Sequence, residues 1–304
     1  MALDSSEETG RENSVSLTED RVQIFSEPLC KTRVMVNCTQ LDATTPRARQ
    51  MLNKVPEVTI YFWIIKVLAT TVGETAADNL NAKLNLGLTG TTYVMGSLLI
   101  ITLLFQFRCR KYMPGIYWLA VVLLSIVGTL ITDNLVNNFG VPLETTTIIF
   151  SVALAATFAA WYASEKTLSI HTIYTTRREA FYWAAILFTF ALGTAAGDLV
   201  GEKLNLGYWK SALIFGALIA VVAAGAFGFT LNMVLAFWIA YILTRPLGAS
   251  IGDYLSQART DNGLGLGTVW TSVLFLAAIL SLVVYLTITR RDQLRSPAEE
   301  KSVV

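Results

Sequence analysis

Apolar residues dominate the chain from about residue 57 onward, in eight stretches separated by short polar segments. A membrane-spanning helix needs roughly 20 mainly apolar residues, and each stretch comes close to that length. The predicted spans are residues 57–80, 91–107, 114–136, 146–163, 179–200, 209–227, 231–251 and 267–289. The pattern therefore predicts an all-α fold, a polytopic membrane bundle of eight transmembrane helices.

A spaced motif recurs four times within these stretches: a tryptophan, a glycine ten residues later and an aspartate fifteen residues later. Its members are Trp63, Gly73 and Asp78; Trp118, Gly128 and Asp133; Trp183, Gly193 and Asp198; and Trp238, Gly248 and Asp253. The first and third tryptophans are 120 residues apart, as are the second and fourth (183 − 63 and 238 − 118). The spacing predicts four two-helix repeats in two pseudo-symmetric halves, residues 54–172 and 173–292.

The repeats are predicted to be parallel, because each contains two spans and so all enter the membrane from the same side. All four aspartates then lie at one depth. Lysine and arginine are concentrated in the loops on the side of the two termini, which predicts that both termini are cytoplasmic. Residues 1–53 read as a disordered polar extension, and residues 293–304 as a cytoplasmic tail.

The aspartates are the candidate ion-binding residues, because hydrocarbon cannot solvate a carboxylate and four in register indicate a built site. One helical turn before the aspartates stand Glu74, Thr129, Thr194 and Ala249, on the same helix face. Such oxygen donors suit Mg²⁺ or Mn²⁺ better than Zn²⁺. Asp78 and Glu74 form the candidate metal pair. Converging carboxylates need a bound cation or proton to balance their charge, which favours proton coupling.

Two basic residues also fall inside predicted spans. Lys66 follows Trp63 by three residues, and its ammonium is expected to reach water at the cytoplasmic interface. Arg245 lies in the middle of its span, followed by Pro246, which removes a backbone donor and is expected to kink the helix. Any partner of Arg245 is expected on another helix. These three residues are candidates for gating or counter-charge.

Simpler interpretations of the motif stay open at this stage. The tryptophans could form an aromatic belt at the membrane interface, and the glycines could permit close helix packing. The aspartates could cap neighbouring loop amides.

Composition excludes other classes of protein. Only 15% of residues are charged, the net charge is +1, and no basic patch with interleaved aromatic residues occurs, so a nucleic-acid partner is not expected. No motif for nucleophilic, zinc or phosphate chemistry is present, which argues against an enzyme and against a bound cofactor. The expected partners are the lipid bilayer and a small cation or solute.

The run from Lys54 to Thr59 (KVPEVT), together with Phe62–Trp63 and the segment from Gly73 to Asp78 (GETAAD), resembles the DUF347-type bacterial membrane proteins. That family has four tandem repeats, each with two membrane helices and a characteristic tryptophan, and the resemblance covers about residues 54–290. It implies a bacterial cytoplasmic membrane. It implies no activity.

The leading functional hypothesis is a transporter or exporter of a hard cation of the Mg²⁺ or Mn²⁺ class, with proton coupling. One alternative is a proton-coupled transporter of an anionic or organic solute that uses Arg245. Another is a structural membrane protein that transports nothing.

Overall fold

The computed structural model describes residues 53–84, 86–204, 206–228 and 231–293. The predicted N-terminal extension and C-terminal tail lie outside these residues, except for residues 53 and 293. The described residues contain eight helices that are long and apolar enough to cross a membrane and contain no strand, which confirms the predicted fold class. These helices are α3 (Ile60–Leu84), α4 (Gly87–Arg108), α5 (Pro114–Asp133), α6 (Leu143–Glu165), α7 (Thr176–Asp198), α8 (Tyr208–Gly228), α9 (Met233–Ser256) and α10 (Thr268–Thr289).

Four helices form an inner ring, and they are the four that carry the Trp–Gly–Asp motif. Around the ring, α3 packs on α5, α5 on α7, α7 on α9, and α9 back on α3. The burial of the helices follows from this arrangement: 78% of the most apolar window of α5 is buried, against 11% of that of α8. The end of the ring with the four tryptophans is termed the Trp end, and the opposite end the Asp end.

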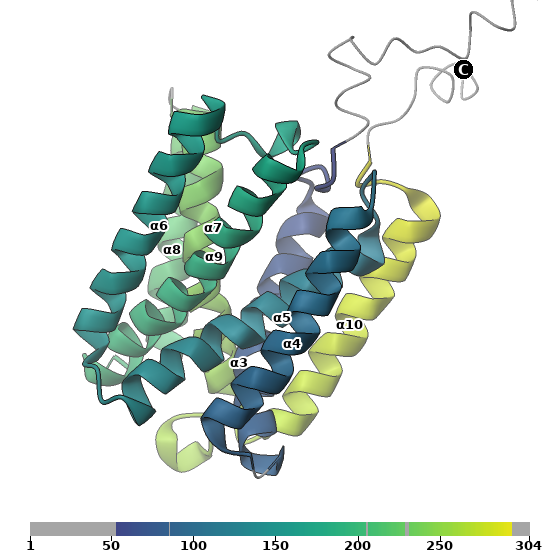
Figure 1. Cartoon of the computed structure of the whole chain (residues 1–304). Helices are drawn as coiled ribbons and strands as arrows, with labels where there is room; N and C mark the ends of the chain where they lie inside the picture. Colours follow the sequence, from purple (N-terminus) through teal and green to yellow (C-terminus); the bar gives the residue numbers. More distant parts are fainter. Residues whose placement is uncertain (1–52, 85, 205, 229–230, 294–304) are drawn as a thin grey trace, which may run out of the picture. The chain divides into compact units, whose positions relative to one another are not determined.

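The outer helices pack on the inner helix of the following repeat. Helix α4 lies against α5, α6 against α7, α8 against α9, and α10 against α3 (Figure 1). The two helices of a predicted repeat are therefore not the main packing pair; α3 touches α4 much less than it touches α10. The boundary predicted at residues 172 and 173 falls between α6 and α7, which pack closely, and the described residues belong to one compact unit.

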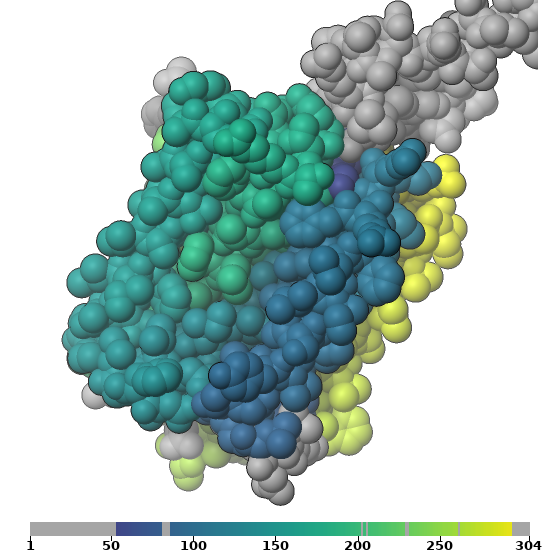
Figure 2. Space-filling model, viewed as in Figure 1, coloured from purple at the N-terminus to yellow at the C-terminus, as the bar shows by residue number. Residues whose placement is uncertain are grey.

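The outward surface of the outer helices is apolar. Figure 2 shows α4 and α6 covering much of the face turned toward the viewer. Large exposed side chains on α4 include Tyr93, Ile100, Leu104 and Phe105, and those on α6 include Ile148 and Val152. Water would solvate such a surface poorly, whereas lipid chains match it. The chain is a multi-pass membrane protein.

The motif glycines lie where neighbouring inner helices cross. Each faces the residue seven positions after the tryptophan of the next repeat: Gly73 faces Ser125, Gly128 faces Phe190, Gly193 faces Arg245, and Gly248 faces Thr70. A Cβ atom at any of the four would come within 2.7 Å of that residue's side chain. The predicted packing role of the glycines is thus confirmed.

The motif tryptophans form an aromatic layer together with the residues that directly precede them. Each packs against the aromatic residue that precedes the tryptophan of the previous repeat, with centroid distances of 5.6 Å (Phe62–Trp118), 5.5 Å (Tyr117–Trp183), 6.3 Å (Tyr182–Trp238) and 5.7 Å (Phe237–Trp63). Trp118, Trp183 and Trp238 are buried. The interpretation as an interfacial belt is wrong for these three, because their rings pack against aromatic residues of the preceding inner helix. This layer closes the Trp end of the ring.

Residues 53–59 cross the Trp end before α3 begins. The Lys54 amine donates to Glu179 Oε2 at 2.7 Å and to the Phe107 carbonyl at 3.1 Å, and both charged side chains are buried. The backbone N–H of Glu57 donates to the Asp292 carbonyl at 2.9 Å, beyond the end of α10. The segment therefore fastens the start of α3 to the end of α4, the start of α7 and the residues after α10.

Two titratable side chains beside this segment have pKa values shifted from their ordinary values. Glu57 Oε2 lies 3.5 Å from His171 Nδ1 and raises the pKa of His171. Burial raises the pKa of Asp292, whose carboxylate accepts a 2.6 Å hydrogen bond from the Tyr112 hydroxyl. Both shifts occur at the Trp end and leave the Asp end unaffected.

At the Asp end, two inner helices widen into π-helical turns directly after their aspartates. These turns are η1 (Asn134–Asn138) after Asp133, and η3 (Leu199–Lys203) after Asp198. The amide of Asn134 donates to Thr92 Oγ1 at 2.8 Å and to the Leu130 carbonyl at 2.7 Å, which fixes the first turn against α4. Single π-helical turns are frequent at functional sites.

Candidate functional site

Equivalent positions of the four repeats meet inside the ring, in layers along its length. The aromatic layer at the Trp end comes first. Next come the residues three and seven positions after each tryptophan, then those eleven positions after it, and finally the aspartates. Since the inner helices are parallel and in register, each layer collects one residue from each repeat.

Arg245 is the centre of the layer below the aspartates. Its Nη2 donates to Glu74 Oε2 and to Thr194 Oγ1, both at 2.8 Å, and also to Thr129 Oγ1. Its Nη1 donates to the Thr70 carbonyl at 3.2 Å. Glu74, Thr129 and Thr194 come from α3, α5 and α7, so one guanidinium joins all four inner helices.

The expectation that Arg245 finds its partner on another helix is confirmed. The side chain has no exposed surface, and its ion pair with Glu74 is buried. Glu74 is consequently not a free extra acid next to Asp78; its charge is balanced by Arg245. This geometry supports a counter-charge role for Arg245 and leaves little of the guanidinium available to an anionic solute.

Pro246 does not end the helix that carries Arg245. Helix α9 runs through it from Met233 to Ser256. The ring of Pro246 lies against Gly193 and Gly197 of α7, with its Cδ 3.1 Å from the position that a Cβ of Gly193 would take. The two glycines thus make room for the arginine–proline pair.

The four aspartates line one cavity of about 220 Å³ at the Asp end. Asp78, Asp133, Asp198 and Asp253 all contribute, and Glu74 contributes from the layer below. The remaining lining residues are Leu88, Val136, Asn137, Leu143 and Gln257. The four aspartates therefore converge on one cavity, a question that the sequence left open, and Thr129 and Thr194 lie below them and accept from Arg245.

The aspartates are spread around the cavity wall. Within the described ranges, no three histidine, cysteine, aspartate or glutamate side chains lie close enough together to hold a metal ion directly. Each of the four aspartates also has an interaction within the protein. Asp78 and Glu74, the candidate metal pair, both line this cavity, and their role as metal ligands stays a prediction.

Lys66 does not reach water, contrary to expectation. Its side chain is completely buried, and Nζ lies 4.1 Å from the centroid of the Phe190 ring and 4.2 Å from that of Tyr241. The residue turns into the ring because it lies on the inner face of α3, one turn before Thr70. Helical rise gives its depth correctly but carries no information about the direction in which it points.

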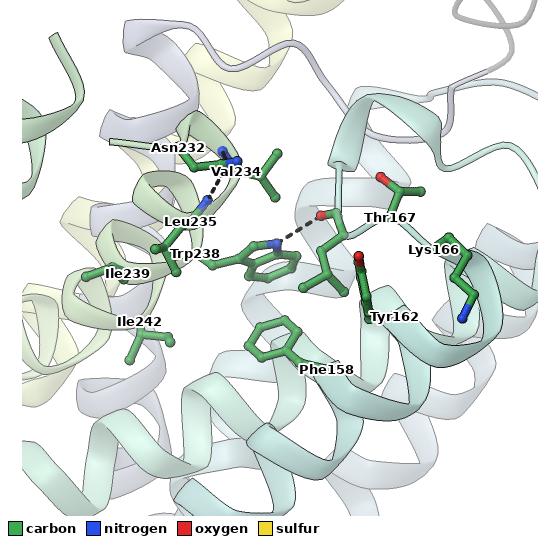
Figure 3. A pocket seen from close by; sticks show the side chains of 11 residues that line it. Phe158, Tyr162, Lys166, Thr167, Asn232, Val234, Leu235, Trp238, Ile239 and Ile242 are labelled. Atoms are coloured by element: carbon green, nitrogen blue, oxygen red, sulfur yellow. Dashed lines mark hydrogen bonds between the residues drawn. The ribbon is translucent and has the colours of Figure 1, made fainter. Parts of the chain in front are cut away.

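A second pocket, of about 520 Å³, lies between the C-terminal end of α6 and the N-terminal end of α9. Figure 3 shows Trp238 at its centre, donating from Nε1 to the Leu168 carbonyl at 3.0 Å. Asn232 caps α9 by accepting from the N–H groups of Val234 and Leu235. Most of the lining is apolar, and Lys166 lies at the edge farthest from Ile239 and Ile242. This pocket is therefore mainly apolar, and its one charged lining residue, Lys166, lies at the edge.

Sequence reasoning missed two groups of residues. The polar side chains of Asn137 and Gln257 line the aspartate cavity; each lies four residues after an aspartate of the motif, a shared spacing that could have revealed them. The aromatic residues Phe62, Tyr117, Tyr182 and Phe237 each directly precede a motif tryptophan. Alignment of the four repeats would have revealed this second group.

Comparison with known families supports the repeat architecture. Residues 61–112, 116–167, 181–229 and 236–292 each match the family model described as Repeat of Unknown Function (DUF347). No curated protein and no solved structure matches the chain. The four matches cover most of the chain and coincide with the four repeats, so the chain belongs to the DUF347 repeat family.

Proposed function

We propose that this membrane protein transports a hard divalent cation of the Mg²⁺ or Mn²⁺ class through the aspartate cavity. The observation that carries the proposal is the convergence of four aspartates, one from each repeat, on a single cavity. Intramembrane carboxylates are costly and usually mark ion pathways. The basic loops support a cytoplasmic Trp end, in which case the cavity faces the outside of the cell.

The size of the cavity supports a cation that keeps its water shell. A water needs about 10–15 Å³ of cavity volume, so the cavity of about 220 Å³ has room for a cation with six waters. Mg²⁺ gives up its waters reluctantly and is commonly bound by only one or two carboxylates. The wide spacing of the acids suits such water-mediated binding better than direct ligation by three acids.

Neutralising single aspartates tests the proposal. The purified protein is reconstituted in vesicles, and entry of Mn²⁺ or Mg²⁺ is followed with an enclosed indicator dye. Each of Asp78→Asn, Asp133→Asn, Asp198→Asn and Asp253→Asn is expected to lower the initial flux about tenfold, because losing about 1.4 kcal/mol of ion stabilisation changes binding by that factor.

Glu144→Gln is the matched control. Glu144 lies at the same end of the protein and is paired with Lys203, but it is half-exposed and outside the cavity. Its flux is expected to equal that of the wild type. Wild-type flux in all four aspartate variants would falsify the proposal.

The mode of binding has a separate test. Hexaamminecobalt(III) resembles a hydrated Mg²⁺ ion but does not exchange its ligands, so it can occupy only a site that accepts the whole shell. We expect it to inhibit Mg²⁺ flux competitively in the wild type and to bind at least about tenfold more weakly to Asp133→Asn. Lack of competition in vesicles that do transport Mg²⁺ would show that the ion binds directly to the carboxylates.

A further inference from the structure

Lys66 places its amine in the middle of the ring, between aromatic side chains. None of the residues that the structure describes accepts a hydrogen bond from its Nζ. The contacts of the amine are the faces of the Phe190 and Tyr241 rings. Aromatic faces attract a cation, but they provide much less stabilisation than a carboxylate or water.

Two other buried basic residues, Lys54 and Arg245, have hydrogen-bond acceptors for their charge, as a structural role requires. Lys54 has Glu179 and a backbone carbonyl as acceptors, and Arg245 has Glu74, two hydroxyls and a carbonyl. Buried charges are normally paired in this way. Lys66 departs from the pattern, and a methionine would fill the same space between the rings without an unmet charge.

The position of Lys66 blocks the axis electrostatically. Arg245 lies over the same Phe190 ring, with its Cζ 6.0 Å from the centroid, so two basic groups stand between the aspartate cavity and the aromatic layer. Glu74 balances only one of them. A divalent cation that moves from the cavity toward the Trp end meets this excess positive charge, which repels it strongly in a medium of low dielectric constant.

We propose that Lys66 is the coupling residue of the transporter, exchanging a proton with solution each time a cation passes through the ring. The proposal rests on the proposed cation transport. As an ammonium ion, Lys66 closes the axis to cations; after its proton has passed along the neighbouring tyrosine hydroxyls to water beyond the Trp end, the neutral amine lets the cation pass. Rebinding of a proton from solution restores the ammonium ion and completes the cycle.

The groups around Lys66 fit this exchange. The charged or titratable side chains near it are Arg245 and Tyr241 on α9 and, on its own helix, Glu74, which is held by Arg245. The hydroxyl of Tyr241 is buried and has no hydrogen-bond partner among the described residues. In the aromatic layer, the hydroxyls of Tyr117 and Tyr182 lie 2.5 Å apart. These hydroxyls place proton-carrying groups between Lys66 and the Trp end.

Two substitutions with opposite expected effects test the proposal. Lys66→Met is permanently neutral, so Mn²⁺ flux in vesicles is expected to continue while the accompanying proton movement, read with a pH dye, is lost. Lys66→Arg is permanently charged, so Mn²⁺ flux is expected to fall about tenfold. Mn²⁺ binding to the cavity, measured by calorimetry, is expected to stay within about twofold of wild type for both. If Lys66 had only a structural role, Lys66→Met and Lys66→Arg would not differ in Mn²⁺ flux in this way.

Lys203→Met is the control, because Lys203 is half-exposed at the Asp end; its proton-to-Mn²⁺ ratio is expected to match that of the wild type. A wild-type proton-to-Mn²⁺ ratio in Lys66→Met overturns the proposal. If Lys66→Arg does not fold, the result for Lys66→Met alone decides the test. Equal loss of flux in both variants with intact Mn²⁺ binding also overturns it. Wild-type Mn²⁺ flux without proton movement refutes the coupling and leaves cation transport standing. Absence of any wild-type flux of Mn²⁺ or Mg²⁺ refutes the transport proposal itself, and the coupling role falls with it.

Discussion

Arg245→Met is expected to destabilise the protein by about 3–5 kcal/mol, the usual cost of removing one partner of a buried ion pair. Glu74 would keep a buried charge without its counter-ion, and the hydroxyls of Thr129 and Thr194 would lose the group that they share. For a domain of this size, the midpoint of thermal unfolding in detergent should fall by roughly 6–20 °C.

A double variant separates the effect of the unpaired Glu74 charge from the effect of losing the other contacts of Arg245. In Arg245→Met/Glu74→Gln no unpaired charge remains, so most of the lost stability should return. Arg177→Met is the control, because Arg177 is 68% exposed and its ion pair with Glu165 spans 3.8 Å; such pairs contribute at most about 1 kcal/mol. If the double variant unfolds at the same temperature as the single one, the ion pair is not what Arg245 supplies.

Gly73→Ala is expected to open the contact between α3 and α5, with a loss of about 3 kcal/mol, at the upper end of the cost of overpacking. The new Cβ would overlap Ser125 Oγ and would lie 2.6 Å from the Ser125 Cβ and 3.0 Å from its carbonyl carbon. A rotation of the serine side chain cannot relieve contacts with these last two atoms. The thermal unfolding midpoint, measured as above, should therefore fall.

Two comparisons make this result specific to the helix contact. Adding Ser125→Gly to Gly73→Ala removes the overlapping side chain and should restore much of the stability. Gly96→Ala, on the outer helix α4, adds a Cβ that meets nothing within 4 Å, and it should leave the midpoint unchanged or raise it, because alanine favours helix over glycine by about 1 kcal/mol. A Gly73→Ala protein as stable as Gly96→Ala would contradict the close approach of α3 and α5.

The sequence predicted how far along its helix each residue lies better than it predicted which side of the helix faces the ring. The eight apolar stretches sufficed for the eight helices, and the spacing from Trp63 to Gly73 to Asp78, repeated four times, sufficed for the common level of the aspartates. It did not reveal the burial of Lys66. An inner helix that is apolar on most sides has no distinct polar face, so hydrophobic periodicity does not show which side faces the ring.

The partner of Arg245 was beyond sequence reasoning for a related reason. Glu74, Thr129 and Thr194 were selected as neighbours of the aspartates on their own helices. Their shared contact with Arg245 depends on the order of the helices around the ring and on the rotation of each helix. The closing of the ring by α9 against α3 brings residues 171 positions apart into one ion pair, and no local pattern encodes that distance.

The offset packing of outer on inner helices has a consequence for how the molecule is completed. Helix α3 is the first of the described helices along the chain, yet the outer helix that covers it is α10, the last of them. Until α10 arrives, the flank of α3 that it covers has only lipid as a neighbour. The first and last described helices thus form the seam of the bundle, and the contact of α10 with α3 is the one that completes it.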